Sequence, residues 1–170
     1  MLSWSHHAMS QAAATAFGLL GLAPGEDISL PAAASLLALS GADSRRVLHE
    51  LEDGHLLRQH LPGRYRMHDL VRLYAVDRAD HDHPEAIRTS AVRRVADFYL
   101  HTAFAADELL QPLLPPVDAG EPADGCRPLG LPDRAAALEW FTAEHANPLA
   151  AQDLAAARGW ADSVTGWPGC

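Results

Sequence analysis

Residues 56–74 read Leu-Leu-Arg-Gln-His-Leu-Pro-Gly-Arg-Tyr-Arg-Met-His-Asp-Leu-Val-Arg-Leu-Tyr and decide the fold. Pro62-Gly63 marks a turn, and Arg64–Met67 alternates polar and apolar residues with the period of a half-buried strand. After Asp69, which occupies an N-cap position, apolar residues recur at helical spacing. The stretch predicts a β-hairpin that leads directly into a helix. The junction, Met67-His68-Asp69, is the first place to look for function.

Three helices are predicted before this hairpin. The first runs from Ser10 to about Leu20, and the second from Leu30 to Leu39, with Ser29 as its N-cap. Ser40-Gly41 ends the second helix, and the third begins at Asp43 or Ser44. Three helices, a hairpin and a closing helix from Asp69 to Arg78 form the winged-helix arrangement, a variant of the helix-turn-helix. The expected fold class is therefore mainly α, with a winged-helix domain followed by a helical arm.

The second half of the chain is also helical in pattern. A long helix is expected from Pro84 to Leu110, followed by an exposed, mobile linker rich in proline and glycine. Asp133 caps a further helix, and Asn147-Pro148 provides the N-cap and first residue of another that ends at Gly159. Two antiparallel helices here suit the first unit of a helical repeat. The expected divisions are 1–79 (winged helix), 80–111 (long helix), 112–132 (linker), 133–159 (helical hairpin) and 160–170 (irregular tail).

Composition excludes several classes of function. The formal charge is −9, and the first 79 residues carry 7 arginines against 8 acids, so no net basic domain is present. The chain has no lysine, which excludes a G-x-x-x-x-G-K-[ST] phosphate loop. No apolar run is long enough to span a membrane, and no N-terminal signal pattern is present. Cys126 and Cys170 are far apart and form neither a disulfide framework nor a metal quartet, so a cytoplasmic location is expected.

Several segments together resemble one family of regulators. The segments are Leu2–Ser5, Phe17–Leu22, Asp27–Leu30, Leu48–Leu51, Gly63–Ala75, Asp133–Phe141 and Glu144–Asn147. They are similar to the part of an NB-ARC (STAND-type) NTPase regulator that follows its nucleotide-binding core. The nearest subgroup is the actinobacterial antibiotic-pathway type of transcriptional regulator, which continues into tetratricopeptide repeats.

The resemblance implies a role for the junction. In such regulators the winged helix packs on the nucleotide core, and the histidine that matches His68 contacts the β-phosphate of bound ADP. Asp69 would orient the loop, and Met67 would pack inward. An imidazole at a helix N-terminus is well placed to donate to a phosphate. ADP or ATP is implied for a complete family member, with a nucleotide-binding core domain or another protein as partner.

The nucleotide core itself is missing from these 170 residues. We therefore expect a fragment, which has no cofactor of its own as an isolated chain. An uncovered apolar face on a single repeat unit favours self-association.

DNA binding is the alternative function. The third predicted helix occupies the position of a recognition helix, and the candidate contacts are Arg45, Arg46, Arg58, Arg64 and Arg66. The same helix carries four acids, which oppose an approach to phosphates: Asp43, Glu50, Glu52 and Asp53. An arginine-bearing wing would suit an acidic protein partner equally well.

Catalytic and metal sites are not indicated. His81-Asp82-His83 provides neighbouring ligand types without a distant fourth, so a solvated loop is the simpler interpretation. His6-His7 has the same standing. No Gly-x-Ser-x-Gly elbow is present. We expect a protein that is not an enzyme and holds no metal.

Overall fold

The computed structural model describes residues 9–113, 115 and 119–160. The chain is mainly helical, with one small sheet, and the fold class predicted from the sequence is confirmed. The elements, in order, are α2 (Gln11–Gly21), β1 (Asp27–Ser29), α3 (Leu30–Leu37), α4 (Gly41–Asp53), β2 (Arg58–Leu61), β3 (Arg64–Arg66), α5 (Asp69–Asp82), α6 (Glu85–Leu110), α7 (Arg134–Glu144) and α8 (Ala146–Ala157).

The sheet has three antiparallel strands in the order β1-β3-β2. Tyr65 in the middle strand is opposite Ile28 on one side and Gln59 on the other. The hairpin turns at Gly63, whose φ of +72° is a left-handed conformation that glycine adopts without strain. The predicted hairpin is present, but β1 was not predicted. It is only three residues long and pairs with a strand about 40 positions later, so it leaves no alternation to detect.

Ser40 starts a helix instead of ending one. Its Oγ accepts a hydrogen bond from the backbone N–H of Asp43 at 3.1 Å, which makes it the N-cap of α4. The prediction that α4 begins at Asp43 or Ser44 is therefore late by two or three residues. The preceding helix, α3, ends at Leu37 because Ala38 turns left-handed, with φ of 55°. At the other end of the domain, α5 continues to Asp82 and not only to Arg78.

Helices α2 and α5 pack closely because small residues face each other. A Cβ added to Gly21 would lie 2.8 Å from the Cβ of Ala75, and one added to Gly18 would lie 3.2 Å from the backbone of Ala79. Ala75 and Ala79 are fully buried. We call this the glycine contact. It fixes the closing helix, and thus the Met-His-Asp junction at its start, against the first helix.

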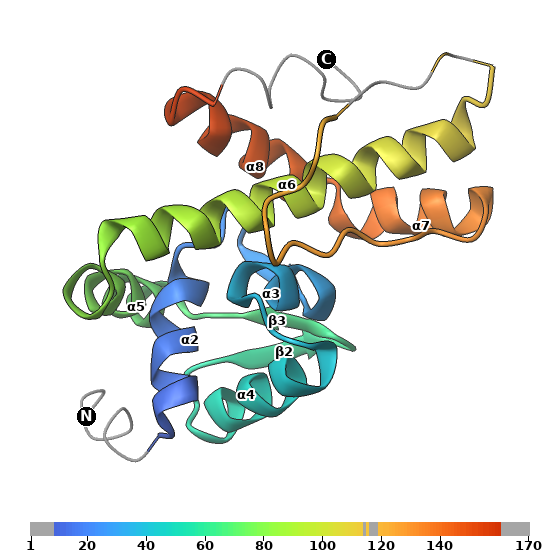
Figure 1. Cartoon of the computed structure of the whole chain (residues 1–170). Helices are drawn as coiled ribbons and strands as arrows, with labels where there is room; N and C mark the ends of the chain where they lie inside the picture. The colour runs from blue at the N-terminus through green and yellow to red at the C-terminus, as the bar shows by residue number, and fades with distance from the viewer. Residues whose placement is uncertain (1–8, 114, 116–118, 161–170) are drawn as a thin grey trace.

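The 26-residue helix α6 crosses the winged-helix domain above α3 (Figure 1). Its Phe98 and Tyr99 are almost fully buried and belong to the same core cluster as Phe17 of α2. Arg94 donates hydrogen bonds to the carbonyl oxygens of Ser35 (3.1 Å) and Leu36 (2.7 Å) at the end of α3. The domain and the helical part, which we call the arm (α6–α8), thus share one core.

The expected antiparallel hairpin of residues 133–159 is not formed. Helices α7 and α8 follow one another along α6, in the direction opposite to it (Figure 1). The residue between them, His145, has helical φ and ψ of −49° and −34°, so the chain bends without turning back. Asp133 caps α7 as predicted, with Oδ1 accepting from Ala136 N–H at 2.9 Å. The N-cap of α8 is His145 and not Asn147, which lies inside the helix.

The proline- and glycine-rich segment is attached to the arm in its described part. The backbone N–H of Ala123 donates to Asp97 (2.9 Å) and that of Leu129 to Thr102 (3.1 Å), both on α6. Arg127 N–H donates to Ser35 Oγ at 3.0 Å. Most described residues of this segment are exposed, as expected, but buried polar side chains of α3 and α6 bind its backbone at these three points.

Two sequence-based assignments lie partly or wholly outside the described residues: the segment Leu2–Ser5 with His6-His7, and the tail 160–170 beyond Trp160. The domain divisions stay predictions. Among the helices of the described residues, none combines the length and apolarity that a membrane span requires.

Candidate functional site

The N-terminus of α5 is capped by His68. Its Nδ1 accepts a hydrogen bond from the backbone N–H of Leu70 at 3.4 Å, so Asp69 is the first helical residue and not the N-cap predicted from the sequence. Because Nδ1 is the acceptor, the proton of the neutral ring is on Nε2. The exposed imidazole therefore offers a donor to solvent at the positive end of a helix dipole.

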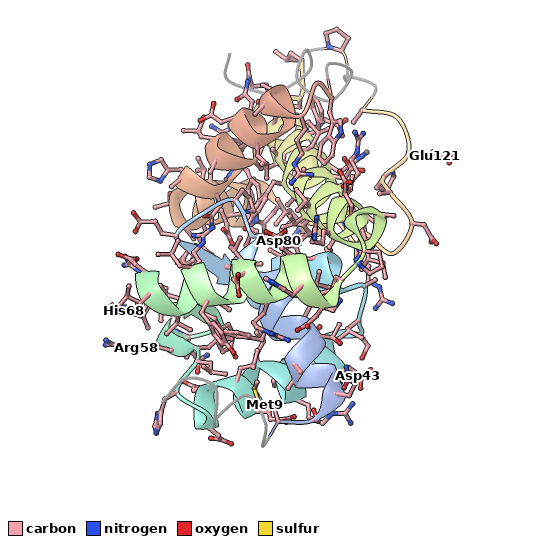
Figure 2. The ribbon with its side chains drawn as sticks, turned by 90° about the vertical axis from the view of Figure 1, so that its left-hand side faces the viewer. Met9, Asp43, Arg58, His68, Asp80 and Glu121 are labelled. Carbon is pink, nitrogen blue, oxygen red and sulfur yellow. The ribbon has the colours of Figure 1, made fainter. Side chains whose placement is uncertain are left out.

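An open groove of about 400 Å³ surrounds this cap. We call it the His68 groove; its lining residues are Arg58, His60, Arg66, Met67, His68 and Asp69. Figure 2 shows Arg58 and His68 close together on the same edge of the molecule, both directed outward. Met67 is only 7% exposed and packs into the core beneath the groove. Two arginines, two histidines and one aspartate are thus the polar and charged side chains that line the groove.

The other arginines proposed for DNA binding are in different surroundings. Arg45 and Arg46 are exposed on α4, and Arg46 donates to Asp43 at 2.7 Å. Figure 2 places Asp43, at the start of α4, on the opposite edge of the domain from Arg58. Arg64 is largely buried and bound to two carboxylates. The five arginines therefore do not form one continuous surface.

Arg64 is the centre of a polar network that sequence reasoning missed. It donates to Asp27 of β1 at 2.6 and 2.9 Å and contacts Glu144 of α7 at 3.0 Å. The Nδ2 of Asn147 donates to Asp27 at 3.1 Å and to Glu144 at 2.7 Å. We call Asp27, Arg64, Glu144 and Asn147 the wing–arm network. It joins the sheet of the winged helix to the bend between α7 and α8.

The network changes the ionisation of its members. Burial alone raises the pKa of Asp27, but hydrogen bonds from Arg64 and Asn147 outweigh it and hold this pKa below its usual value. The hydrogen bond to Asp27 raises the pKa of Arg64, so the guanidinium stays charged. Burial raises the pKa of the neighbouring Tyr99 well above its ordinary value. No sequence signal connects residues 80 and 120 positions apart, although Glu144 and Asn147 do lie three residues apart, at helical spacing.

A second groove, of about 540 Å³, lies next to the network between the hairpin and the α7–α8 bend. His60 and Arg66 line this groove as well as the His68 groove. His60 Nε2 is 3.1 Å from Asp27 Oδ2, and Arg66 Nη2 is 3.1 Å from Glu26. The two grooves therefore share the side chains of the wing.

Apolar side chains continue the surface of the His68 groove along α5. Leu70 and Leu73 are 66% and 68% exposed, which is unusual for leucine on a helix that also contributes to a core. On the other side of α5, Arg72 donates to the carbonyl oxygens of Gly21, Ala23 and Gly25, and so fixes the end of α2. The guanidinium of Arg72 is therefore bound to the backbone of the protein itself.

Metal ligands do not gather in the part of the chain that the structure describes: no three His, Cys, Asp or Glu side chains are placed to hold an ion. His81 is exposed, and its Nδ1 is 2.8 Å from the carbonyl oxygen of Asp77 on the same helix. Cys126 is half-buried, and burial raises the pKa of its thiol to about 11, which keeps it protonated.

Comparison with known proteins gives two related regulators. The "Regulatory protein AfsR" of Streptomyces coelicolor is 43% identical over 146 residues, which is 84% of this chain and 15% of that protein. The protein of the same name from Streptomyces griseus is 43% identical over 152 residues, 89% of this chain and 16% of its own length. No family model and no solved structure matches the chain. The identity supports an AfsR-type regulator family, and the chain is related to one segment of these regulatory proteins.

Proposed function

We propose that the chain is a regulatory module whose winged helix packs on a nucleotide-binding core and reads the diphosphate of bound ADP through His68. The single observation that carries the proposal is the geometry of the cap. The Nδ1 of His68 accepts a hydrogen bond from Leu70 N–H, and the exposed imidazole lines a groove together with Arg58 and Arg66. A phosphate there would meet a helix N-terminus, an imidazole donor and two guanidinium groups.

The exposed leucines support a protein partner beside the anion. Leu70 and Leu73 lie next to the groove and would be covered by a second domain. Apolar contact then provides affinity for the core, while His68 contributes only when a diphosphate is present. This division makes the module responsive to nucleotide, because one state of the core gains contacts that the other lacks.

Similarity to proteins named as regulators supports the same class of function. The chain spans only 15% and 16% of the length of these relatives. The nucleotide-binding core is therefore part of the proposal and is not taken from the described residues.

Calorimetry tests the proposal. The chain is titrated into a form of the S. coelicolor relative that lacks the segment matching this chain, in the presence of either ADP or a non-hydrolysable ATP analogue. We expect tighter binding to the ADP form for the wild-type chain, and equal binding to both forms for His68→Ala. His81→Ala, an exposed histidine on the same helix, is the matched control and should retain the preference. Equal affinity of the wild-type chain for both forms would refute the proposal that the chain distinguishes bound ADP from bound ATP.

DNA binding is the second candidate, because α4 occupies the recognition-helix position and Arg45 is exposed on it. An electrophoretic shift assay at two salt concentrations separates the two functions. Tight binding that weakens steeply with salt, and that is lost in Arg45→Ala with Arg46→Ala, would favour the DNA-binding function. We expect only weak binding, since Asp43 neutralises Arg46 and Arg64 is bound inside the molecule.

A further inference from the structure

We propose that His60 transmits occupancy of the His68 groove to the arm, so that an anion in the groove tightens the contact between the sheet and the α7–α8 bend. This inference rests on the proposed function, because it takes a phosphate-type anion as the ligand of the groove. It adds that the wing–arm network responds to that ligand.

The first step is the charge of the network. Arg64 supplies one positive charge, and Asp27 and Glu144 supply two negative charges within 3.0 Å of it. Asp27 and Glu144 have side chains only 17% and 4% exposed, so water screens the excess negative charge poorly. A second positive charge beside Asp27 would therefore stabilise the closed network.

The second step is the position of His60. Its Nε2 is 3.1 Å from Asp27 Oδ2, so a protonated ring supplies that charge. The same side chain lines the His68 groove. An imidazolium has two N–H donors, one for Asp27 and one for an anion in the groove. One ring thus contacts Asp27 and lines the groove, so an anion that holds the ring in place also holds its contact with Asp27.

The third step is the connection to the arm. Asp27 accepts hydrogen bonds from Arg64 and Asn147, and both of these also bind Glu144 at the end of α7. Gly25 leaves the space that Asn147 requires, because a Cβ there would lie 1.8 Å from its Oδ1. Any change at Asp27 thus reaches the α7–α8 bend through two side chains.

Other charged and titratable groups surround His60 in the two grooves. They are Glu26 before β1, Arg58, Arg64 and Arg66 of the hairpin, His68 and Asp69 at the start of α5, and Glu144 and His145 at the α7–α8 bend. An anion in the groove would lie among the arginines and His68, on the side of His60 away from Asp27.

The test is an NMR titration of the complete chain with inorganic pyrophosphate, which follows the amide signals of Leu70 in the groove and of Glu144 and the Asn147 side chain in the network. In the wild-type chain we expect all of them to shift with one binding curve. The variant His60→Gln keeps a hydrogen-bond donor but cannot carry a charge. In this variant we expect the amide signal of Leu70 to shift and the network signals to remain unchanged. His81→Gln is the matched control and should behave as the wild-type chain.

A second variant tests the reverse direction. Coupling between two sites is reciprocal, so Asn147→Ala, which does not line the His68 groove, should weaken pyrophosphate binding at Leu70 by about fivefold or more. Leu149→Ala, a 58%-exposed residue of the same helix, should leave it unchanged.

The two proposals fail in different ways. Shifts at Leu70 with no shift at Glu144 or Asn147 in the wild-type chain would refute the coupling and leave the anion site intact. The absence of any shift at Leu70 would refute the anion site, and the coupling with it.

Discussion

Two contacts position the Met-His-Asp junction, and they are built in opposite ways. The glycine contact between α2 and α5 joins small residues whose backbones lie almost against each other. The wing–arm network joins the sheet to the α7–α8 bend through charged and amide side chains of residues up to 120 positions apart. The first contact depends on volume, and the second depends on charge balance.

The difference shows which part of the molecule can respond to a ligand. Close-packed small residues have no alternative arrangement at low cost, so the glycine contact holds α5 rigidly. A buried ion network adds little net stability but is sensitive to any added or removed charge. We therefore assign rigidity to the glycine contact and response to the wing–arm network.

Removal of Arg64 should have the largest effect on stability. Arg64→Met leaves Asp27 and Glu144 without their guanidinium partner, and we expect a loss of about 3–5 kcal/mol in the free energy of unfolding. Urea denaturation measures this loss. Arg66→Met is the control: its partner Glu26 is 83% exposed, so a change of about 1 kcal/mol or less is expected. Similar losses in both variants would show that the buried network of Arg64 contributes no more to stability than the exposed ion pair of Arg66.

The glycine contact should be the next most sensitive. In Gly21→Ala the new Cβ meets Ala75 and the backbone of Val76, and we expect a loss of about 1–3 kcal/mol on overpacking. Gly41→Ala, where nothing lies within 4 Å, is the matched control. Because alanine is the better helix former, this control should be neutral or slightly stabilising. A stabilised Gly21→Ala variant would contradict the close contact.

Acid should weaken the network in a defined direction. The folded pKa of Asp27 lies below its unfolded value of 3.8, so its contribution is complete above that value and disappears as the pH falls through the folded pKa. The stability difference between wild type and Asp27→Asn should therefore shrink as urea denaturation is repeated from neutral pH down to about pH 3. For the exposed Asp53→Asn we expect a small difference throughout. A difference for Asp27 that grows on acidification would show the opposite pKa shift.

Loss of an exposed leucine should have the smallest effect on stability. Leu73→Ser removes a side chain that is 68% exposed, so the free energy of unfolding should change by about 0.5 kcal/mol or less. The affinity of the Leu73→Ser variant for the nucleotide core should nevertheless fall, which calorimetry detects. Unchanged affinity would mean that this face of α5 is not the docking surface.

The sequence predicted the parts of the fold that depend on residues close together in the chain. The turn at Pro62-Gly63, the strand after it and the change to helical spacing at Asp69 predicted the hairpin and α5. The three-residue strand β1 and the continuation of α7 into α8 were missed, because the first depends on a distant partner and the second on the geometry of one residue, His145.

The same distinction, between local pattern and contacts of distant residues, applies to the candidate site. Met67-His68-Asp69 was located by its position between strand and helix, and the structure moves only the cap, from Asp69 to His68. Arg64 appeared in the sequence as one more surface arginine of the wing. Its pairing with Asp27 and Glu144 arises from tertiary packing that brings β1, β3 and α7 together, which no local pattern records.

The rate of ADP release tests the central claim most directly. A fluorescent ADP is mixed with a form of the S. coelicolor relative that lacks the segment matching this chain, and release of the bound ADP is followed with the chain absent or present. We predict that the wild-type chain slows release, that His81→Ala slows it equally, and that His68→Ala leaves the rate close to that measured with the chain absent. Equal slowing by the wild-type chain and His68→Ala would contradict a phosphate contact at His68.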